Sequence, residues 1–499
     1  MVIAVVLTYF LVLLGVSRLV ARGGENSNSS FFRAGRQSPW YMVAFGMVGA
    51  SISGVTFVSV PGMVMHSGMT YLQTCMGFIV GYFVVAFVLL PVYYRLNLTS
   101  IYTVLKGTSD EAYRTGAMFF IVSKLLGSAA KFFVPCFIVS RAVGVNFYLT
   151  TIGLFALIWL YTRRGGIKTL VWTDTLQTLC MLTALVLIIY YVYGALFDFQ
   201  FSIINLKECL AAIAQSDYSK VFEFEDWGSA NNFFKCFVAG IFIVIVMTGL
   251  DQDMMQKNLT CKTLRDAQKD MCTYGFAFLP VNALFLGLGV MLTMLCAKEG
   301  VALPDKPDEL LSMFALNGTL GYTVLILFTL GIIATSFSTV DSAITALTTS
   351  FCVDIMGREN DVAMRRKVHI GMTVAMIALT AMFNLVSSHS LIDTIYTLVS
   401  YTYGPLLGLF MYSLIDSPSR PLLKRGEQNE FVRGGGESVV CILSPLICFG
   451  LDTLVPRLTG YHFDYELLLI NGLITYAGLR MLKIGNRRLK IEKFNMDFR

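Results

Sequence analysis

Charged side chains are scarce in this chain of 499 residues, and their scarcity limits the class of protein. Asp, Glu, Lys and Arg make up 14% of the sequence, whereas a soluble domain carries roughly 25%. Apolar residues reach 56%, in many runs of about 20 residues, which is the length of a helix that crosses a bilayer. The composition excludes a soluble protein and indicates an all-α bundle of membrane helices rather than a β-barrel.

Motifs for metal binding and redox chemistry are also missing. The sequence has four His and contains neither HExxH nor CxxC, so metal-dependent catalysis has little support. The 11 Cys are scattered, and several lie within apolar runs, as is typical of small core residues rather than disulfides. No nucleophile–base constellation favours an enzyme either.

The net charge of +6 does not indicate nucleic-acid binding, because the Lys and Arg residues sit in short loops between apolar spans. We count about 13 spans, starting with Val2–Leu19, which lacks the cleavage site of a signal peptide. Basic loops fall at every second connection, and the loops rich in Asp and Glu fall on the other side. The positive-inside rule therefore places the N-terminus outside and the tail in the cytoplasm.

The spans suggest a division of the chain into five parts. These are a leading span with its loop, a block of five spans, an outer loop, a second block of five spans, and two last spans with a tail (residues 1–38, 39–196, 197–232, 233–414 and 415–499). Because five is an odd number, the second block is inverted relative to the first.

Each block opens with an interrupted span. Small and hydroxylated residues fill Gly49–Thr56 in the first block, and Thr248–Asp251 interrupts the second. Paired broken helices in inverted halves are the best sequence pointer to a transporter site. The alternative is close helix packing, which also uses small residues, and Gly is common in membrane helices.

Hydroxyl groups are densest late in the second block, between Ala334 and Thr349. On a helix, Ser338 and Ser342 continue one stripe toward Thr349, and Asp341 borders it. Hydroxyl and carbonyl oxygens suit a hard cation such as sodium. Such side chains also bond to their own helix or join helices, but an acid inside the membrane favours an ion site.

Two further charges lie within apolar spans. Asp174 requires a cation, a Lys or a proton, because a lone carboxylate is costly in a bilayer; Lys168 is a nearby alternative partner. Lys124 shares a helix face with Lys131. It is suited to anchor a substrate carboxylate, to extend to an interface or to pair with an acid.

Four motifs together resemble the sodium:solute symporter family, of the sodium–glucose, sodium–proline and sodium–sialate type. They are Arg33–Arg36 followed by Gly49–Gly54, then Gly249–Lys257, then Ser338–Ser342 with Asp354-Ile355, and Tyr403–Gly408. The resemblance covers almost the whole chain. It implies a LeuT-like core with a 5+5 inverted repeat and a broken first helix in each repeat.

The resemblance also implies sites for sodium. The family's shared site maps to carbonyl and hydroxyl oxygens of Gly49, Ile52, Thr335, Ser338 and Thr339. A second sodium site, which some members have, maps to Asp174, Asp341 and Ser342. Some relatives have Ser where Asp341 stands, so two acids there would either bind sodium more strongly or leave one to carry a proton.

The substrate residues implied by the resemblance are Ser51, Ser53, Thr56, Gln73 and Lys124. The predicted function is sodium-coupled symport of a small solute, with Na⁺ as the only metal, by a monomer in a bacterial inner membrane. Lys124 favours an anionic substrate, such as sialic acid or a small carboxylate, over a neutral sugar. The alternatives are a proton-coupled transporter on the same fold and a membrane sensor that does not transport.

Overall fold

The computed structural model describes residues 2–22, 28–197, 203–316, 319–386, 391–416, 436–461, 463 and 466–497. All the regular secondary-structure elements in these described residues are helices, which confirms the all-α prediction. Eight of the described helices are long and apolar enough to cross a membrane, or ten when each of two bent pairs counts as one span. The total of about 13 spans stays a prediction.

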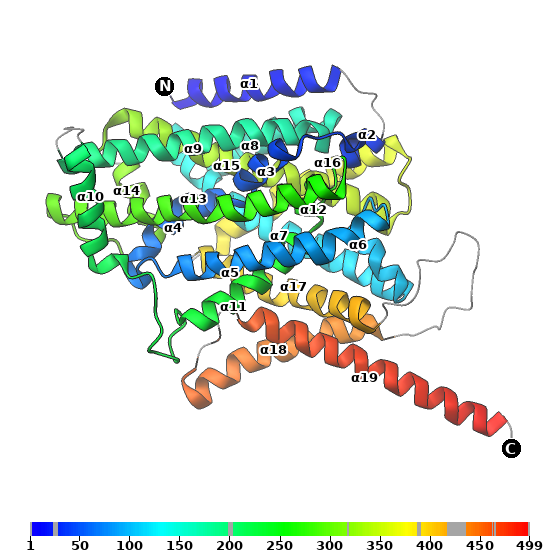
Figure 1. Ribbon diagram of the computed structural model, residues 1–499. Coiled ribbons are helices and arrows are strands. Elements are labelled where there is room, and N and C mark those ends of the chain that lie inside the picture. The colour runs from blue at the N-terminus through cyan, green and yellow to red at the C-terminus, as the bar shows by residue number, and fades with distance from the viewer. Residues whose placement is uncertain are drawn as a thin grey trace.

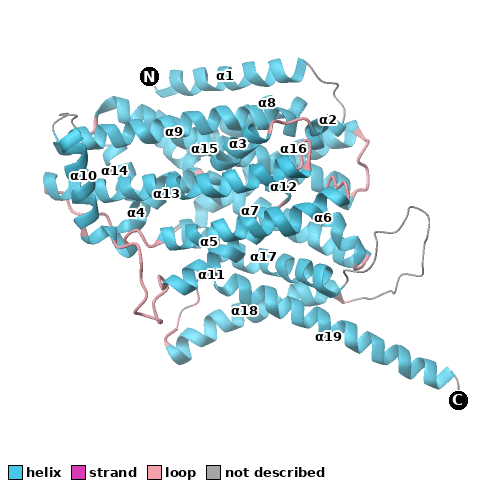
Figure 2. Cartoon of the chain, viewed as in Figure 1, coloured by secondary structure: helices cyan, strands magenta, loops and turns pink. Residues whose placement is uncertain are grey.

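Most of the helices run along one common direction (Figures 1 and 2). The two termini lie at opposite ends of the bundle. The end near the N-terminus also holds α10 (Ile203–Gln215) and α14 (Leu310–Leu316), and the other end holds α2 (Asn28–Arg33) and α12 (Gln252–Asn258). We call the second end the basic end, because α2 carries Arg33 and the segment that follows Arg358 contacts α2 through the hydrogen bond from Asn28 to the Glu359 carbonyl.

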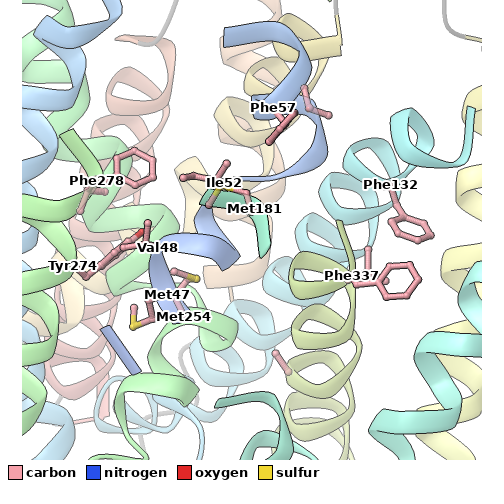
Figure 3. Close-up of a cluster of buried hydrophobic side chains, with 14 of the residues drawn as sticks. Met47, Val48, Ile52, Phe57, Phe132, Met181, Met254, Tyr274, Phe278 and Phe337 are labelled. Carbon is pink, nitrogen blue, oxygen red and sulfur yellow. The ribbon is translucent and has the colours of Figure 1, made fainter. Parts of the chain in front are cut away.

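The first predicted break is present. Helices α3 (Trp40–Ser51) and α4 (Gly54–Ser67) meet at 64° across the extended residues Ile52 and Ser53. Ser53 caps α4, because its hydroxyl accepts a hydrogen bond from the Thr56 N–H at 3.3 Å. Figure 3 shows Ile52 at the break. The helix therefore ends inside the protein, where its last carbonyls are left without intrahelical donors.

The second break is present as well. Helix α11 (Phe233–Val244) passes through a wide π-turn at Ile245–Gly249, and α12 then leaves at 71°. Asp251 caps α12, since its carboxylate accepts from the Asp253 N–H at 2.8 Å. Both interruptions are thus stabilised by polar side chains at the start of the following helix.

Helix α15 (Gly321–Ser350) lies at the centre of the bundle. It packs against α7 (Asp110–Val143), α9 (Ile167–Phe197), α3 and α12. Every residue from 331 to 350 is buried. The hydroxyl-rich stretch therefore faces protein on all sides, next to the first break, rather than lipid.

A glycine sets the approach of α3 to α9. A Cβ at Gly49 would overlap the hydroxyl of Thr178 on α9. Only glycine fits here without displacing one of the helices. The two helices therefore meet at backbone distance, and α9 holds Asp174 against the broken helix.

Candidate functional site

A cavity of about 150 Å³ lies between the two breaks. The first break and α4 contribute hydroxyl groups, α7 contributes two ammonium groups, and the second break contributes two carboxylates. Its polar lining includes Ser51, Ser53, Thr56, Ser123, Lys124, Ser128, Lys131, Thr248, Asp251, Asp253, Thr339 and Tyr403. Three of the predicted substrate residues from the first break are therefore brought together with Lys124.

Lys124 is held by two acids. Its Nζ lies 3.0 Å from Asp251 Oδ2 and 2.8 Å from Asp253 Oδ2. Tyr403, on α17 (Leu391–Asp416), donates its hydroxyl to Asp251 Oδ2 at 2.8 Å. Of the three roles left open for Lys124, the structure shows pairing with an acid, while the side chain still borders the cavity.

Lys131 borders the same cavity, two turns further along α7. Among the described residues no carboxylate lies within ion-pair distance of its ammonium group. The sequence placed Lys131 on the same helix face as Lys124, and that periodicity was the available signal for it. Of the two lysines that line the cavity, Lys131 is therefore the one whose ammonium group can bind an anion without first losing a carboxylate partner.

Gln73 lies elsewhere. It is completely buried, donates to the Asn231 carbonyl at 2.9 Å and accepts from the Glu223 N–H at 3.1 Å. These contacts attach the segment before α11 to α5 (Tyr71–Val84). Gln73 is absent from the cavity lining, so the structure does not place this predicted substrate residue at the site.

Two tyrosines that the sequence analysis did not single out line the wall beside the first break. The Tyr82 hydroxyl donates to that of Tyr274 at 2.7 Å, and Tyr274 in turn bonds to Ser51. Figure 3 shows Tyr274 near Val48 and Phe278. Aromatic residues at scattered chain positions give no sequence signal of a shared wall, because only the tertiary fold brings them together.

Asp174 has a cationic partner, and it is Lys257 rather than Lys168. The Lys257 ammonium lies 2.8 Å from Asp174 Oδ2, and both side chains are almost fully buried. Ser338 donates to Asp174 Oδ1 at 2.8 Å. Lys257 is the last residue of the Gly249–Lys257 motif. The sequence did not indicate that it pairs with Asp174, because the two residues lie in different blocks of the chain.

Asp341 lies in the same buried network. The Tyr161 hydroxyl donates to its Oδ2 at 2.6 Å, and the Ser342 hydroxyl lies 3.2 Å from its Oδ1. The charges of Asp174 and Lys257 both act on Asp341. Two carboxylates and one ammonium group leave one formal negative charge, which one bound cation or proton would neutralise.

Thr339 connects this network to the first break. Its hydroxyl donates to the Thr335 carbonyl at 3.0 Å and lies 3.4 Å from the Ala50 carbonyl. Thr339 also lines the cavity. The hydroxyls of Thr345, Thr348 and Thr349 instead bond to carbonyls of α15 itself, so for these three the alternative of bonding within the helix is correct.

Two interrupted helices from inverted blocks, facing each other across a polar cavity inside an apolar bundle, define a secondary transporter. The profile of the sodium:solute symporter family matches residues 31–417, and the chain belongs to this family.

Several characterised proteins are similar to the chain. It is 25% identical over 413 residues to the human sodium/iodide cotransporter, covering 79% of this chain and 62% of that protein. It is 22% identical over 443 residues to the sodium/sialic acid symporter NanT of Aliivibrio fischeri, covering 84% and 82%. It is 24% identical to the sodium-coupled monocarboxylate transporter 1 of Xenopus laevis, covering 67% and 54%.

Solved structures support the fold. A Na⁺-coupled sialic acid symporter in its substrate-bound outward-open state has a TM-score of 0.78 at 18% identity, covering 95% of this chain and 96% of that one. Mhp1, a nucleobase-cation-symport-1 family transporter, has a TM-score of 0.51 at 14% identity, covering 93% and 96%. The predicted LeuT-like class is confirmed.

The Asp174–Lys257 pair generates a stability prediction. Lys257→Gln leaves a buried carboxylate without its cation, which costs roughly 3–5 kcal/mol, so thermal unfolding of the purified protein should shift to markedly lower temperature. Lys257→Gln/Asp174→Asn should recover much of the loss. Lys220→Gln breaks the exposed Lys220–Glu223 pair and should change little. Equal destabilisation by Lys257→Gln and the double variant would contradict the pairing.

Proposed function

We propose that this protein is a sodium-coupled symporter that imports a compact anion by alternating access. One observation supports it most directly: Thr339, whose hydroxyl lies 3.4 Å from the Ala50 carbonyl beside the first break, also lines the cavity that Lys131 borders. A sodium ion at the break and an anion in the cavity would therefore be neighbours. No catalytic step is part of the proposal.

The charges of the cavity support joint binding of anion and cation. Lys124 and Lys131 carry two formal positive charges, and Asp251 and Asp253 carry two negative ones. An anion entering this neutral site leaves one excess negative charge, which sodium at the break would balance. Each ligand then tightens the binding of the other by the same factor.

The size of the cavity favours a compact substrate. A cavity of about 150 Å³ is comparable to one that holds benzene. The similar proteins are described as transporters of iodide, sialic acid and monocarboxylates. We therefore propose a monovalent anion, with a short carboxylate favoured over the larger sialic acid.

We assign the ions as the family resemblance suggests. The shared sodium site uses oxygens of Gly49, Ile52, Thr335, Ser338 and Thr339, and its support is the 3.4 Å approach of Thr339 to the broken helix. A second cation site uses Asp174, Asp341 and Ser342. Its support is the single negative charge left over in that network.

The basic end of the bundle is proposed to face the cytoplasm, because Lys and Arg gather in its loops. The N-terminus then lies outside, and the protein works as a monomer in a bacterial inner membrane. A proton-coupled transporter on the same fold is the second candidate. It is favoured by one feature, the Tyr161 hydrogen bond to Asp341, which would also accommodate a protonated carboxyl group.

Uptake by proteoliposomes tests the proposal. Under an inward sodium gradient, short carboxylates should accumulate more than sialic acid, neutral sugars or amino acids, and accumulation should stop when potassium replaces sodium. Lys131→Gln should raise the substrate concentration for half-maximal uptake roughly tenfold, while the matched Lys168→Gln should not. Accumulation driven by a pH step without sodium would instead support proton coupling.

The shared sodium site makes a separate prediction. Ser338→Ala and Thr339→Ala each remove a hydroxyl ligand, so each should raise the sodium concentration for half-maximal uptake roughly tenfold. Thr329→Ala on the same helix is the control, because its buried hydroxyl donates to the Leu325 carbonyl at 2.8 Å and has no other partner in the described part of the chain. Normal sodium dependence in both site variants would refute the assignment.

The second cation site predicts a change in steepness. Asp341→Asn removes the excess negative charge without separating Lys257 from Asp174, so the Hill coefficient for sodium should fall toward about one. Tyr161→Phe removes the hydrogen bond to Asp341 but keeps the charge and should retain the wild-type coefficient. If Asp341→Asn also retains it, sodium does not bind there.

A further inference from the structure

A second cavity, of about 460 Å³, opens at the basic end of the bundle. It lies between α2, α8 (Phe147–Gly165) and the start of α16 (Val362–Val386), and it shares no lining residue with the transport cavity. Its lining includes the side chains of Phe31, Trp159, Arg163, Arg365, Arg366 and His369. The volume lies within the range of roughly 300–1,000 Å³ that is usual for small-ligand sites.

Aromatic rings hold two of the arginines in place. The Arg365 guanidinium lies 4.5 Å from the ring centre of Phe31 and is almost fully buried. The Arg163 guanidinium lies 4.8 Å from the ring centre of Trp159. A guanidinium stacked on a ring retains its positive charge and its planar set of N–H donors, which suit a planar or tetrahedral anion. The cavity therefore combines one buried arginine, Arg365, with two exposed ones, Arg163 and Arg366, at its rim.

His369 adds a buried polar atom to the same wall. The side chain is 3% exposed, and its Nε2 lies 3.4 Å from the Thr162 hydroxyl. Its Nδ1 is buried and has no hydrogen-bond partner in the described part of the chain. A buried polar atom of this kind usually has a partner, and a ligand in the cavity would supply one.

The positive charge of the cavity favours a negatively charged ligand. Three arginines line it, and its lining contains no Asp or Glu. Asp361, which directly precedes α16, lies 3.9 Å from Arg358, and neither residue is part of the lining. Arginines gathered in this way favour an oxyanion that accepts several charge-assisted hydrogen bonds, of which phosphate is the common case.

The exposed apolar surface beside the cavity favours a lipid as the ligand over a soluble phosphate compound. Ile370 lines the cavity and is 48% exposed, and Val374, one turn further along α16, is 58% exposed. Ile152 on α8, which packs against α16, is 51% exposed. An apolar strip thus starts at the cavity and continues along the two helices. Trp159 and Arg163 are also residue types that gather at membrane interfaces.

We propose that this cavity binds the phosphate headgroup of an anionic phospholipid from the membrane leaflet at the basic end, with an acyl chain along α8 and α16. Basic pockets between membrane helices on the cytoplasmic side are suited to such headgroups. The bound lipid would join α2 to the α8–α16 pair. The site is separate from the transport cavity and does not depend on the identity of the transported solute.

Native mass spectrometry of the purified protein in neutral detergent tests the site. The probes are phosphatidylglycerol, phosphatidylcholine and soluble sn-glycerol 3-phosphate. Wild type should retain one phosphatidylglycerol, and Arg163→Gln/Arg366→Gln should bind it at least about tenfold more weakly, because two charge-assisted contacts are lost. Arg358→Gln/Lys367→Gln removes the same charge from the same end outside the cavity and should bind it as wild type does.

Thermal unfolding gives a second measurement that also checks folding. Phosphatidylglycerol should raise the unfolding temperature of wild type and the control variant but not of Arg163→Gln/Arg366→Gln. Phosphatidylcholine should raise the unfolding temperature of wild type and of the control variant less than phosphatidylglycerol does. Equal retention of phosphatidylglycerol by the cavity variant and wild type would overturn the site. Binding of sn-glycerol 3-phosphate as tight as that of phosphatidylglycerol would overturn the lipid assignment, because the acyl chain would then contribute nothing.

Discussion

The arrangement of this protein depends on compensating buried charge inside an apolar bundle. Asp174, Asp341, Lys124 and Lys257 all lie on membrane helices, where an isolated charge is costly. Each has a partner at hydrogen-bond distance. These contacts fix α7, α9, α12 and α15 around the first break, so the oxygen-rich centre forms only when the helices of both blocks are assembled.

The same constraint explains the position of the breaks. A helix that stops inside the protein exposes carbonyls that need a donor or a cation. At the first break, Thr339 from α15 approaches the Ala50 carbonyl. At the second, the hydroxyls of Tyr93 and Tyr102 donate to the carbonyls of Gly249 and Leu250, each at 2.8 Å. The second break is therefore satisfied by tyrosines, and the first retains more capacity for an ion.

The sequence was a good guide to local features and a poor one to contacts across the fold. Gly, Ser and Thr in the middle of an apolar span weaken a helix by their own chemistry, so both breaks were predictable. The partners of Lys124 could not be read from periodicity, because Asp251 is 127 positions away. The contacts of Gln73 could not be read from the sequence either, because its partner Asn231 is also far away in the chain. Its position on the helix after the first break suggested the cavity, but its amide faces the segment before α11.

The three buried ion pairs of α12 and its cap have a mechanical consequence. Asp251, Asp253 and Lys257 all belong to α12 or its cap, and their partners Lys124 and Asp174 lie on α7 and α9 of the first block. The ion pairs thus clamp this short helix to α7 and α9 of the other block, in addition to its packing against α15. If the repeats rock against each other, α12 travels with α7 and α9, and the flexing point falls at the π-turn Ile245–Gly249, where the backbone is already wound irregularly.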